Sequence, residues 1–240
     1  MKRRQAIKIS SIAAIGATAT ISSGCSSNEF SFNHGVASGD PLEDRVILWT
    51  RVTPSKPGPL NVILEISQNE KFSDISFVKK LQTSSLSDYT IKYDFLANDY
   101  CDGHKGFFYR FRAGDAISEV GQSKIFSSET QEIKIGIFSC SNYPAGYFNA
   151  YEAAAEKNDL DLWLHLGDYL YEYPMGGYAT ESAEKLGRTP NPKHEMITLA
   201  DYRQRHAQYK LDQGSQALHK NAPLISVWDD HEFSNDTWKR

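Results

Sequence analysis

The hydrophobic pattern of this chain changes near residue 130, and no other feature constrains the fold as strongly. Before this point, short alternating runs are separated by turn residues. After it, apolar runs of strand character alternate with helical runs. The first pattern is typical of a β-sandwich, and the second is typical of a parallel or mixed sheet. The sequence therefore predicts a β-sandwich domain at 30–130, followed by an α/β domain at 132–240.

Five strands are predicted in the first region, and clusters of Gly, Pro, Asn and Asp separate them. They cover residues 46–52, 61–66, 77–81, 90–95 and 107–113. Short strands at this spacing favour a sandwich of the immunoglobulin or fibronectin kind. The two lone histidines of this region, His34 and His104, are interpreted as hydrogen-bonded surface or loop groups.

Three strands are predicted in the second region, and the first of them is expected to be buried. They cover residues 133–139, 160–166 and 224–228. An Ala- and Glu-rich run at 146–157 predicts a helix. A second helix is expected to begin at Thr198, because Asp201 three residues later completes a capping box. A long loop at 169–197, with Gly and Pro residues, connects the second strand to this helix.

Each of these three strands is followed by side chains that bind metals in proteins. The strands end in Ser139-Cys140-Ser141-Asn142, in Gly167-Asp168-Tyr169-Leu170-Tyr171 and in Asp229-Asp230-His231-Glu232. In sheets of this class, ligands bind outside the carboxyl ends of the strands. A Gly-Asp after one strand is usually only a turn, but three such endings together predict a metal centre at one rim.

The chemistry of these residues suits hydrolysis of a phosphate ester. Two metal ions provide hydroxide at neutral pH to attack phosphorus, and they neutralise the phosphoryl charge. Asp168 is the best bridging carboxylate and a catalytic candidate, while a Cys140 thiolate and a Tyr171 phenolate suit ferric iron. Asp230 offers oxygen to a second, harder ion. His231 is the second catalytic candidate, because it can hydrogen-bond the phosphoryl or leaving-group oxygen.

The segments around these residues resemble the alkaline phosphatase D family, that is, the PhoD-like metallophosphatases. The resemblance rests on FNHGVASGDP with VILWTRVTP, FSCSNYPAGYFNAY, HLGDYLYEY, YRQRHAQYKLD and SVWDDHEFSND, in this order. It covers nearly all of the chain after the first residues. It implies an immunoglobulin-like N-terminal domain, a metallophosphatase-like catalytic domain, twin-arginine export, and iron with calcium as cofactors. Zinc or another divalent metal is the alternative.

Carried over residue by residue, the resemblance makes Cys140, Asp168 and Tyr171 iron ligands, with Asp168 also bridging. Asp230 stands where the wider superfamily has the Asn of Gly-Asn-His-Glu, and His231 matches the His that follows.

Asn235 is assigned as a further oxygen ligand. A later Asp-x-His pair of the family has no match before Arg240. We therefore interpret 132–240 as the N-terminal part of a truncated catalytic domain. We expect the chain alone to be a poor enzyme or none, with apolar faces uncovered near Leu166 and Val227.

The first residues, 1–25, are predicted to be a signal segment. Lys2, Arg3 and Arg4 precede a mildly apolar stretch at 9–21 that is too short to span a bilayer. The arginine pair resembles a twin-arginine signal, which makes the Tat translocon an expected partner, and an ordinary Sec signal is the alternative. Cys25 after Gly24 leaves open a lipoprotein tether to the membrane. The mature protein is expected to be periplasmic or extracellular.

The net charge of −4 offers no bulk attraction to nucleic acid, so a phosphate ester is the expected partner and nucleic acid is not. Two alternatives remain open. A phospholipid-directed phosphoesterase would carry an apolar funnel in the loop at 169–197. A non-catalytic surface module would use the sandwich for binding and retain only a remnant of the catalytic half.

Several other side chains receive structural interpretations. His165 is interpreted as a satisfied core histidine, and Arg203 and Arg205 as a solvated helix face. Glu232 is interpreted as a group that orients its neighbours. A disulfide between Cys101 and Cys140 is possible, although the metal role suits Cys140 better.

Overall fold

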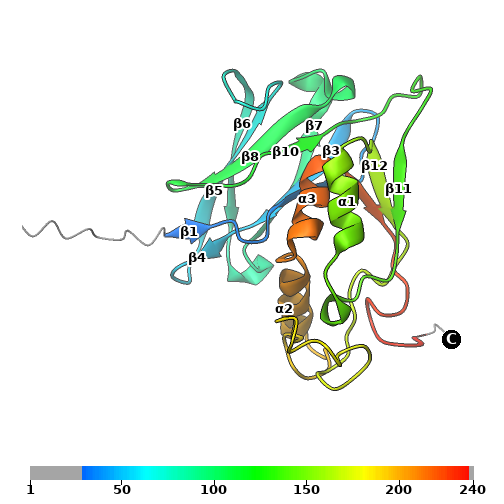
Figure 1. Cartoon of the computed structure of the whole chain (residues 1–240). Helices are drawn as coiled ribbons and strands as arrows, with labels where there is room; N and C mark the ends of the chain where they lie inside the picture. The colour runs from blue at the N-terminus through cyan, green and yellow to red at the C-terminus, as the bar shows by residue number, and fades with distance from the viewer. Residues whose placement is uncertain (1–28, 238–240) are drawn as a thin grey trace, which may run out of the picture.

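The computed structural model describes residues 29–237 (Figure 1). The predicted signal segment and Cys25 lie outside the described residues. Two large sheets, one two-stranded sheet, three α-helices and four short 3₁₀ turns form the described part of the chain. None of its helices combines the length and the apolar character needed to cross a membrane.

The first sheet has five strands and is antiparallel throughout. Its main path runs through β10 (Gly121–Ser123), β8 (Phe107–Ala113), β5 (Leu60–Ser67) and β6 (Ile75–Thr83), and β9 (Ala116–Ile117) pairs with β8. A separate short pair joins β1 (Phe30–Ser31) to β4 (Thr53–Pro54). The predicted strands 61–66, 77–81 and 107–113 are therefore confirmed within one or two residues.

The second sheet has six strands and connects the two regions of the chain. Its order is β11 (Ile135–Phe138), β12 (Leu162–His165), β13 (Leu224–Ser226), β2 (Val36–Gly39), β3 (Arg45–Arg51) and β7 (Thr90–Leu96). The strands β11, β12 and β13 are parallel, and β2, β3 and β7 pair in antiparallel fashion. The two halves meet where Leu224 pairs with Gly39. A Cβ at Gly39 would lie 2.8 Å from the Leu224 carbonyl oxygen, so only glycine permits this close contact.

The main hydrophobic core lies between the two sheets in the N-terminal region. Alternate residues of β3 and β8 are buried, as the period of two predicts for strands with one covered face. Leu48 and Phe95 from the second sheet share one buried cluster with Leu64 and Phe111 from the first. Each such side chain contributes about 1.5–3 kcal/mol by leaving water. The predominance of β-sheet in this region agrees with the prediction.

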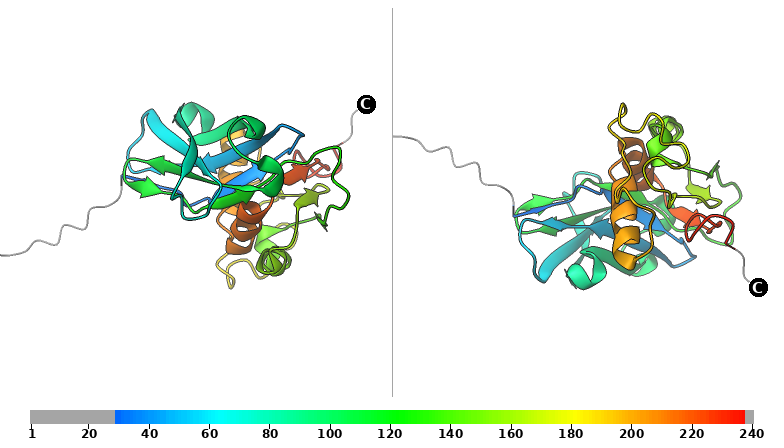
Figure 2. Two further views of the ribbon diagram at one scale, coloured as in Figure 1. Left: turned by 90° about the horizontal axis from the view of Figure 1, so that it is seen from above. Right: turned by 90° about the horizontal axis from the view of Figure 1, so that it is seen from below.

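Helices cover one face of the parallel strands (Figures 1 and 2). Trp163 of β12 is buried with Leu218 in the cluster beneath α1 (Asn149–Lys157) and α3 (Gln213–Asn221). The helix α2 (Leu199–Tyr209) begins with the predicted capping box of Thr198 and Asp201. The four 3₁₀ turns are η1 (Ser85–Ser87), η2 (Ala97–Asp99), η3 (Gly103–Lys105) and η4 (Tyr143–Ala145).

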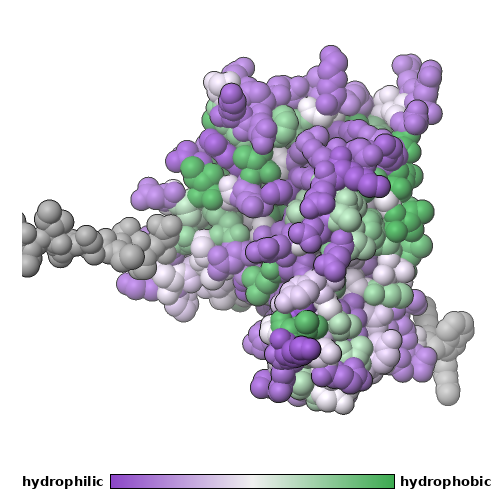
Figure 3. Space-filling view, viewed as in Figure 1, coloured by the Kyte–Doolittle hydropathy of each residue, from purple (hydrophilic) through white to green (hydrophobic). Residues whose placement is uncertain are grey.

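The opposite face of the parallel strands is open. Ile135 and Ile137 of β11 are exposed, the latter at 64%, so the prediction of a fully buried first strand is wrong. Their register places them beside Leu162 and Leu164 on one face of the sheet. Apolar side chains gather along this edge of the molecule (Figure 3). Leu166 and Val227 are also exposed, at 52% and 54%, which confirms the prediction of uncovered apolar faces near them.

Candidate metal centre

The loops after β11 and β12 bring Cys140 and Asp168 together. The backbone N–H of Cys140 donates to the Gly167 carbonyl at 3.1 Å, and that of Ser141 donates to the Asp168 carbonyl at 2.9 Å. Cys140 and Asp168 both adopt left-handed backbone conformations, with φ of 57° and 54°. Such conformations cost about 1–3 kcal/mol each in residues other than glycine and are concentrated at functional sites.

The loop after β13 packs directly against the same turn. A Cβ on Gly167, which has φ of 101°, would lie 2.5 Å from the Cβ of Asp229. Only glycine fits this conformation and this contact, so Gly167 allows the loop at 229–232 to approach Asp168.

Asp168 is the centre of the group. It is buried, and its Oδ2 accepts from the Tyr171 hydroxyl at 3.2 Å and from Cys140 Sγ at 3.4 Å. Its Oδ1 is buried and has no hydrogen-bond partner among the described residues. An unpaired buried carboxylate oxygen is costly unless a cation or another donor satisfies it. The carboxylate therefore suits a metal ligand.

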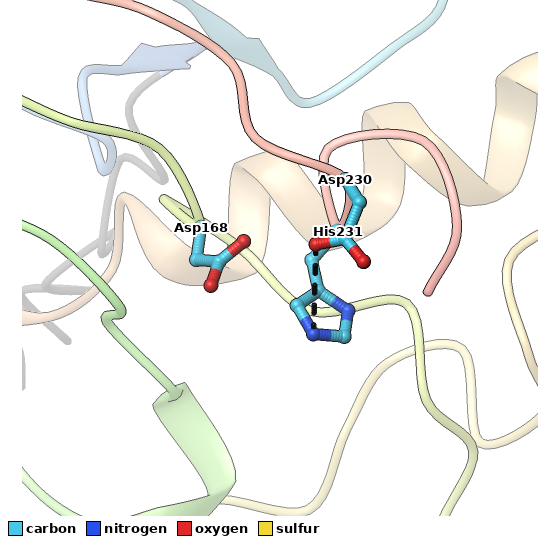
Figure 4. A group of neighbouring side chains, drawn as sticks. All are labelled: Asp168, Asp230 and His231. Carbon is cyan, nitrogen blue, oxygen red and sulfur yellow. Dashed lines mark ion pairs between the residues drawn. The ribbon is translucent and has the colours of Figure 1, made fainter. Parts of the chain in front are cut away.

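Asp230 and His231 complete a cluster that can hold a cation. One ligand atom from each of Asp168, Asp230 and His231 lies within 4.8 Å of the others (Figure 4). His231 Nε2 is 4.0 Å from Asp230 Oδ1. The three side chains come from the loops after two neighbouring parallel strands, as the sequence predicted for one rim.

The surroundings of Tyr171 also favour a bound cation. Burial, together with the nearby Asp168 and Cys140, raises the pKa of the Tyr171 hydroxyl above its ordinary value. As a neutral phenol, Tyr171 donates to Asp168. A phenolate at this position would need a cation between the two oxygen atoms, because the two anions would otherwise repel each other.

Comparison with known proteins establishes the family. The model of the PhoD-like phosphatase family matches residues 135–240, and that of the PhoD-like phosphatase N-terminal domain matches residues 17–127. The chain belongs to the PhoD-like phosphatase family. It is 37% identical to alkaline phosphatase D of Bacillus subtilis (strain 168) over 222 residues. A solved structure of PhoD superposes on it with a TM-score of 0.77 at 35% identity, over 85% of this chain and 40% of that one.

The match to the Bacillus relative covers 87% of this PhoD-like chain but only 36% of the relative. The chain thus spans little more than a third of the relative's length.

Glu172 is a residue of this PhoD-like site that the sequence reasoning missed. The residue is 1% exposed, and its Oε2 lies 2.9 Å from His231 Nδ1. Its Oε1 accepts the backbone N–H of Asn235 at 2.7 Å. The carboxylate can only accept, so Nδ1 carries the proton and Nε2 is left for the site. The position of Glu172 directly after Tyr171 was the available signal.

Glu232 holds the loops of the site together, as the interpretation of this residue predicted. Its buried carboxylate accepts the backbone N–H groups of Asp168 at 3.1 Å and of Asp229 at 2.9 Å, and also that of Tyr169. One side chain from the loop after β13 thereby fixes the backbone of the loop after β12.

The interpretation of Arg205 as part of a solvated helix face is wrong. Arg205 is 1% exposed, and its guanidinium donates to the carbonyls of Tyr171, Tyr173 and Pro192. A loop without helix or strand exposes carbonyl oxygens, and a buried guanidinium satisfies several at once. Tyr209, four residues later, is buried on the same side of α2, and this spacing was the signal that the prediction overlooked.

The structure also places Asn235, His165 and the two cysteines Cys101 and Cys140. The side-chain nitrogen of Asn235 donates to Asp236 at 3.0 Å, and its role as a metal ligand stays a prediction. His165 is fully buried, with Nε2 3.1 Å from the Ser141 hydroxyl, whereas its Nδ1 has no partner among the described residues. It is therefore only partly satisfied. Cys101 and Cys140 are free thiols, so the possible disulfide between them is not formed.

Proposed function

We propose that this chain belongs to an exported, metal-dependent hydrolase of phosphate esters, of the alkaline phosphatase or phosphodiesterase type. The observation that carries the proposal is the convergence of Asp168, Asp230 and His231 within 4.8 Å, beside Cys140 and Tyr171. The name of the Bacillus relative, alkaline phosphatase D, supports the same reaction class.

The donor set fits ferric iron and calcium. Cys140, Asp168 and Tyr171 would hold iron, because thiolate and phenolate are strong donors for this ion. Asp230, with Asp168 and Asn235, would hold calcium through oxygen atoms. The unpartnered Oδ1 of Asp168 supports a cation at this position. Metals bound there would lower the pKa of a bound water molecule and neutralise the charge of the phosphoryl group. Zinc or another divalent metal is the alternative.

His231 would be the residue that transfers a proton in the reaction. Nδ1–H donates a hydrogen bond to Glu172, so Nε2 is the nitrogen that faces the cluster. With the ring doubly protonated, Nε2–H would donate a hydrogen bond to a phosphoryl oxygen or give its proton to the leaving oxygen. Glu172 also bonds the backbone of Asn235, so the ring has a fixed orientation relative to its own loop.

The test uses the full-length protein, loaded with iron and calcium, and two chromogenic substrates, a nitrophenyl phosphate monoester and the corresponding diester. We expect turnover of at least one substrate, loss of turnover with a chelator, and a visible band from the ferric–phenolate and ferric–thiolate bonds. A colourless, iron-free and active protein would refute the iron assignment. Absence of turnover in the metal-loaded full-length protein would refute the hydrolase.

The proposal also covers the export of the protein and the kind of sandwich that its sheets form. The basic residues Arg3 and Arg4 before an apolar stretch support export through the twin-arginine translocon, and Cys25 supports a membrane tether. Intact-mass measurement of the exported protein tests both points. A mature N-terminus at Met1 would refute the signal segment, and an unmodified Cys25 would refute the tether. We also propose that the two facing sheets form an immunoglobulin-like sandwich.

A further inference from the structure

A cleft lies between the outer face of β2, β3 and β7 and the helix α2. Its volume is about 800 Å³, which is within the range of small-molecule sites. The loop after β13 forms its third side. Cys140, Asp168, Asp230 and His231 do not line it, whereas Glu232 does, so the cleft adjoins the candidate metal centre but does not contain its predicted ligands.

The most unusual group in the cleft is the ammonium of Lys210, at the C-terminal end of α2. Its Nζ lies 2.6 Å from His219 Nε2 and 5.3 Å and 5.2 Å from the ring centroids of Trp49 and Tyr169. It forms no ion pair with any residue in the described part of the chain. An ammonium has three donors, so two remain for another acceptor. Burial lowers the pKa of Lys210 to about 7, and a bound anion would offset this effect.

The other charges of the cleft leave a positive excess. Lys92 and Arg203 also line it, and neither has an ion pair within residues 29–237. Arg51 is neutralised by Asp88 at 2.8 Å. The two other carboxylates that line the cleft are Asp40 and Glu232, and the latter accepts three backbone N–H groups. The four cations of the lining therefore exceed its three carboxylates by one charge.

The walls of the cleft are largely apolar. Trp49 lies near Lys210. Leu224 lies at the junction of the two halves of the sheet. Trp228 and Phe233 line the cleft and are 77% and 61% exposed. Both rings are therefore accessible to a molecule in the cleft.

We propose that this cleft binds an organic anion that carries one acidic head group on a flat apolar body. The head group binds the two free donors of Lys210, and the body packs against Trp49 and the exposed rings of Trp228 and Phe233. Charge complementarity selects the anion, because the cleft contains more unpaired cations than free carboxylates. The inference does not depend on the proposed hydrolase activity.

Calorimetric titration with naphthalene-2-sulfonate tests this site. The full chain is used with the Asp168→Asn substitution and a chelator, so that the candidate metal centre cannot retain the anion. The neutral control ligand is naphthalene-2-methanol, which has the same rings. We expect one sulfonate per chain, with at least tenfold weaker binding of the alcohol.

Two matched variants locate the head group. Lys210→Met keeps the length of the side chain and removes the half-buried charge, so it should fold and should weaken sulfonate binding at least tenfold. Lys80→Met, on the exposed surface of β6, should leave binding unchanged. Equal affinity for sulfonate and alcohol would overturn the proposal, because the cleft would then be only an apolar surface. Unchanged binding by Lys210→Met, or no binding by the parent chain, would overturn it as well.

Discussion

Replacing Glu232 by Gln should destabilise the protein by about 2.5–5 kcal/mol. The carboxylate accepts three backbone N–H groups, from Asp168, Tyr169 and Asp229. The amide group of Gln would face one of them with its own N–H, so one charge-assisted bond, worth about 1.5–3 kcal/mol, is lost. The other two become neutral bonds and weaken by roughly 0.5–1 kcal/mol each. Urea unfolding, with comparison of midpoints at constant m, measures the change.

The same substitution should also weaken metal binding by roughly ten- to a hundredfold, because Glu232 fixes the backbone of Asp168. The control is Glu184→Gln, since Glu184 is exposed in the long loop after β12. It should leave both stability and metal affinity unchanged. A loss of less than about 1 kcal/mol in Glu232→Gln with normal metal affinity would refute the role of Glu232 as the group that holds the loops together.

Three further predictions concern single side chains. Asp168→Asn in the full-length protein should lose metal and activity together, as measured by metal analysis and ester hydrolysis; normal values of both would contradict its bridging role. Iodoacetamide at pH 8 should modify exposed Cys140 well before Cys101, because burial raises the pKa of Cys101 to about 11; peptide mapping should also show that metal protects Cys140. Lys210→Met should raise the free energy of unfolding more at pH 6 than at pH 10. The reason is that burial lowers the pKa of Lys210 from 10.5 to about 7. The charged Lys210 therefore reduces the free energy of unfolding fully below pH 7, and this reduction disappears as the pH rises towards 10.5. An equal gain at both pH values would show that Lys210 is not desolvated.

The sequence by itself determined the elements whose pattern is local. Alternating apolar residues marked β3 and β8 almost to the residue, because the side chains of a strand have a period of two. The start of α2 followed from Thr198 and Asp201, which bond to each other within one turn. The positions of Cys140, Asp168 and Asp230 after three strands followed from chain order, and parallel pairing then placed the strand ends together.

Only the tertiary structure decided which distant groups meet. Glu172 binds His231 across 59 positions of sequence, and Arg205 binds the carbonyls of a loop that precedes its helix by many residues. The helix α3 was missed because its short sequence, which contains Gly and Asn, has weak helical propensity, and burial of Leu218 against Trp163 stabilises it. The junction of β13 with β2 depends on one residue pair. Periodicity shows which face of an element is apolar, but the partner of that face is set by packing across the whole chain.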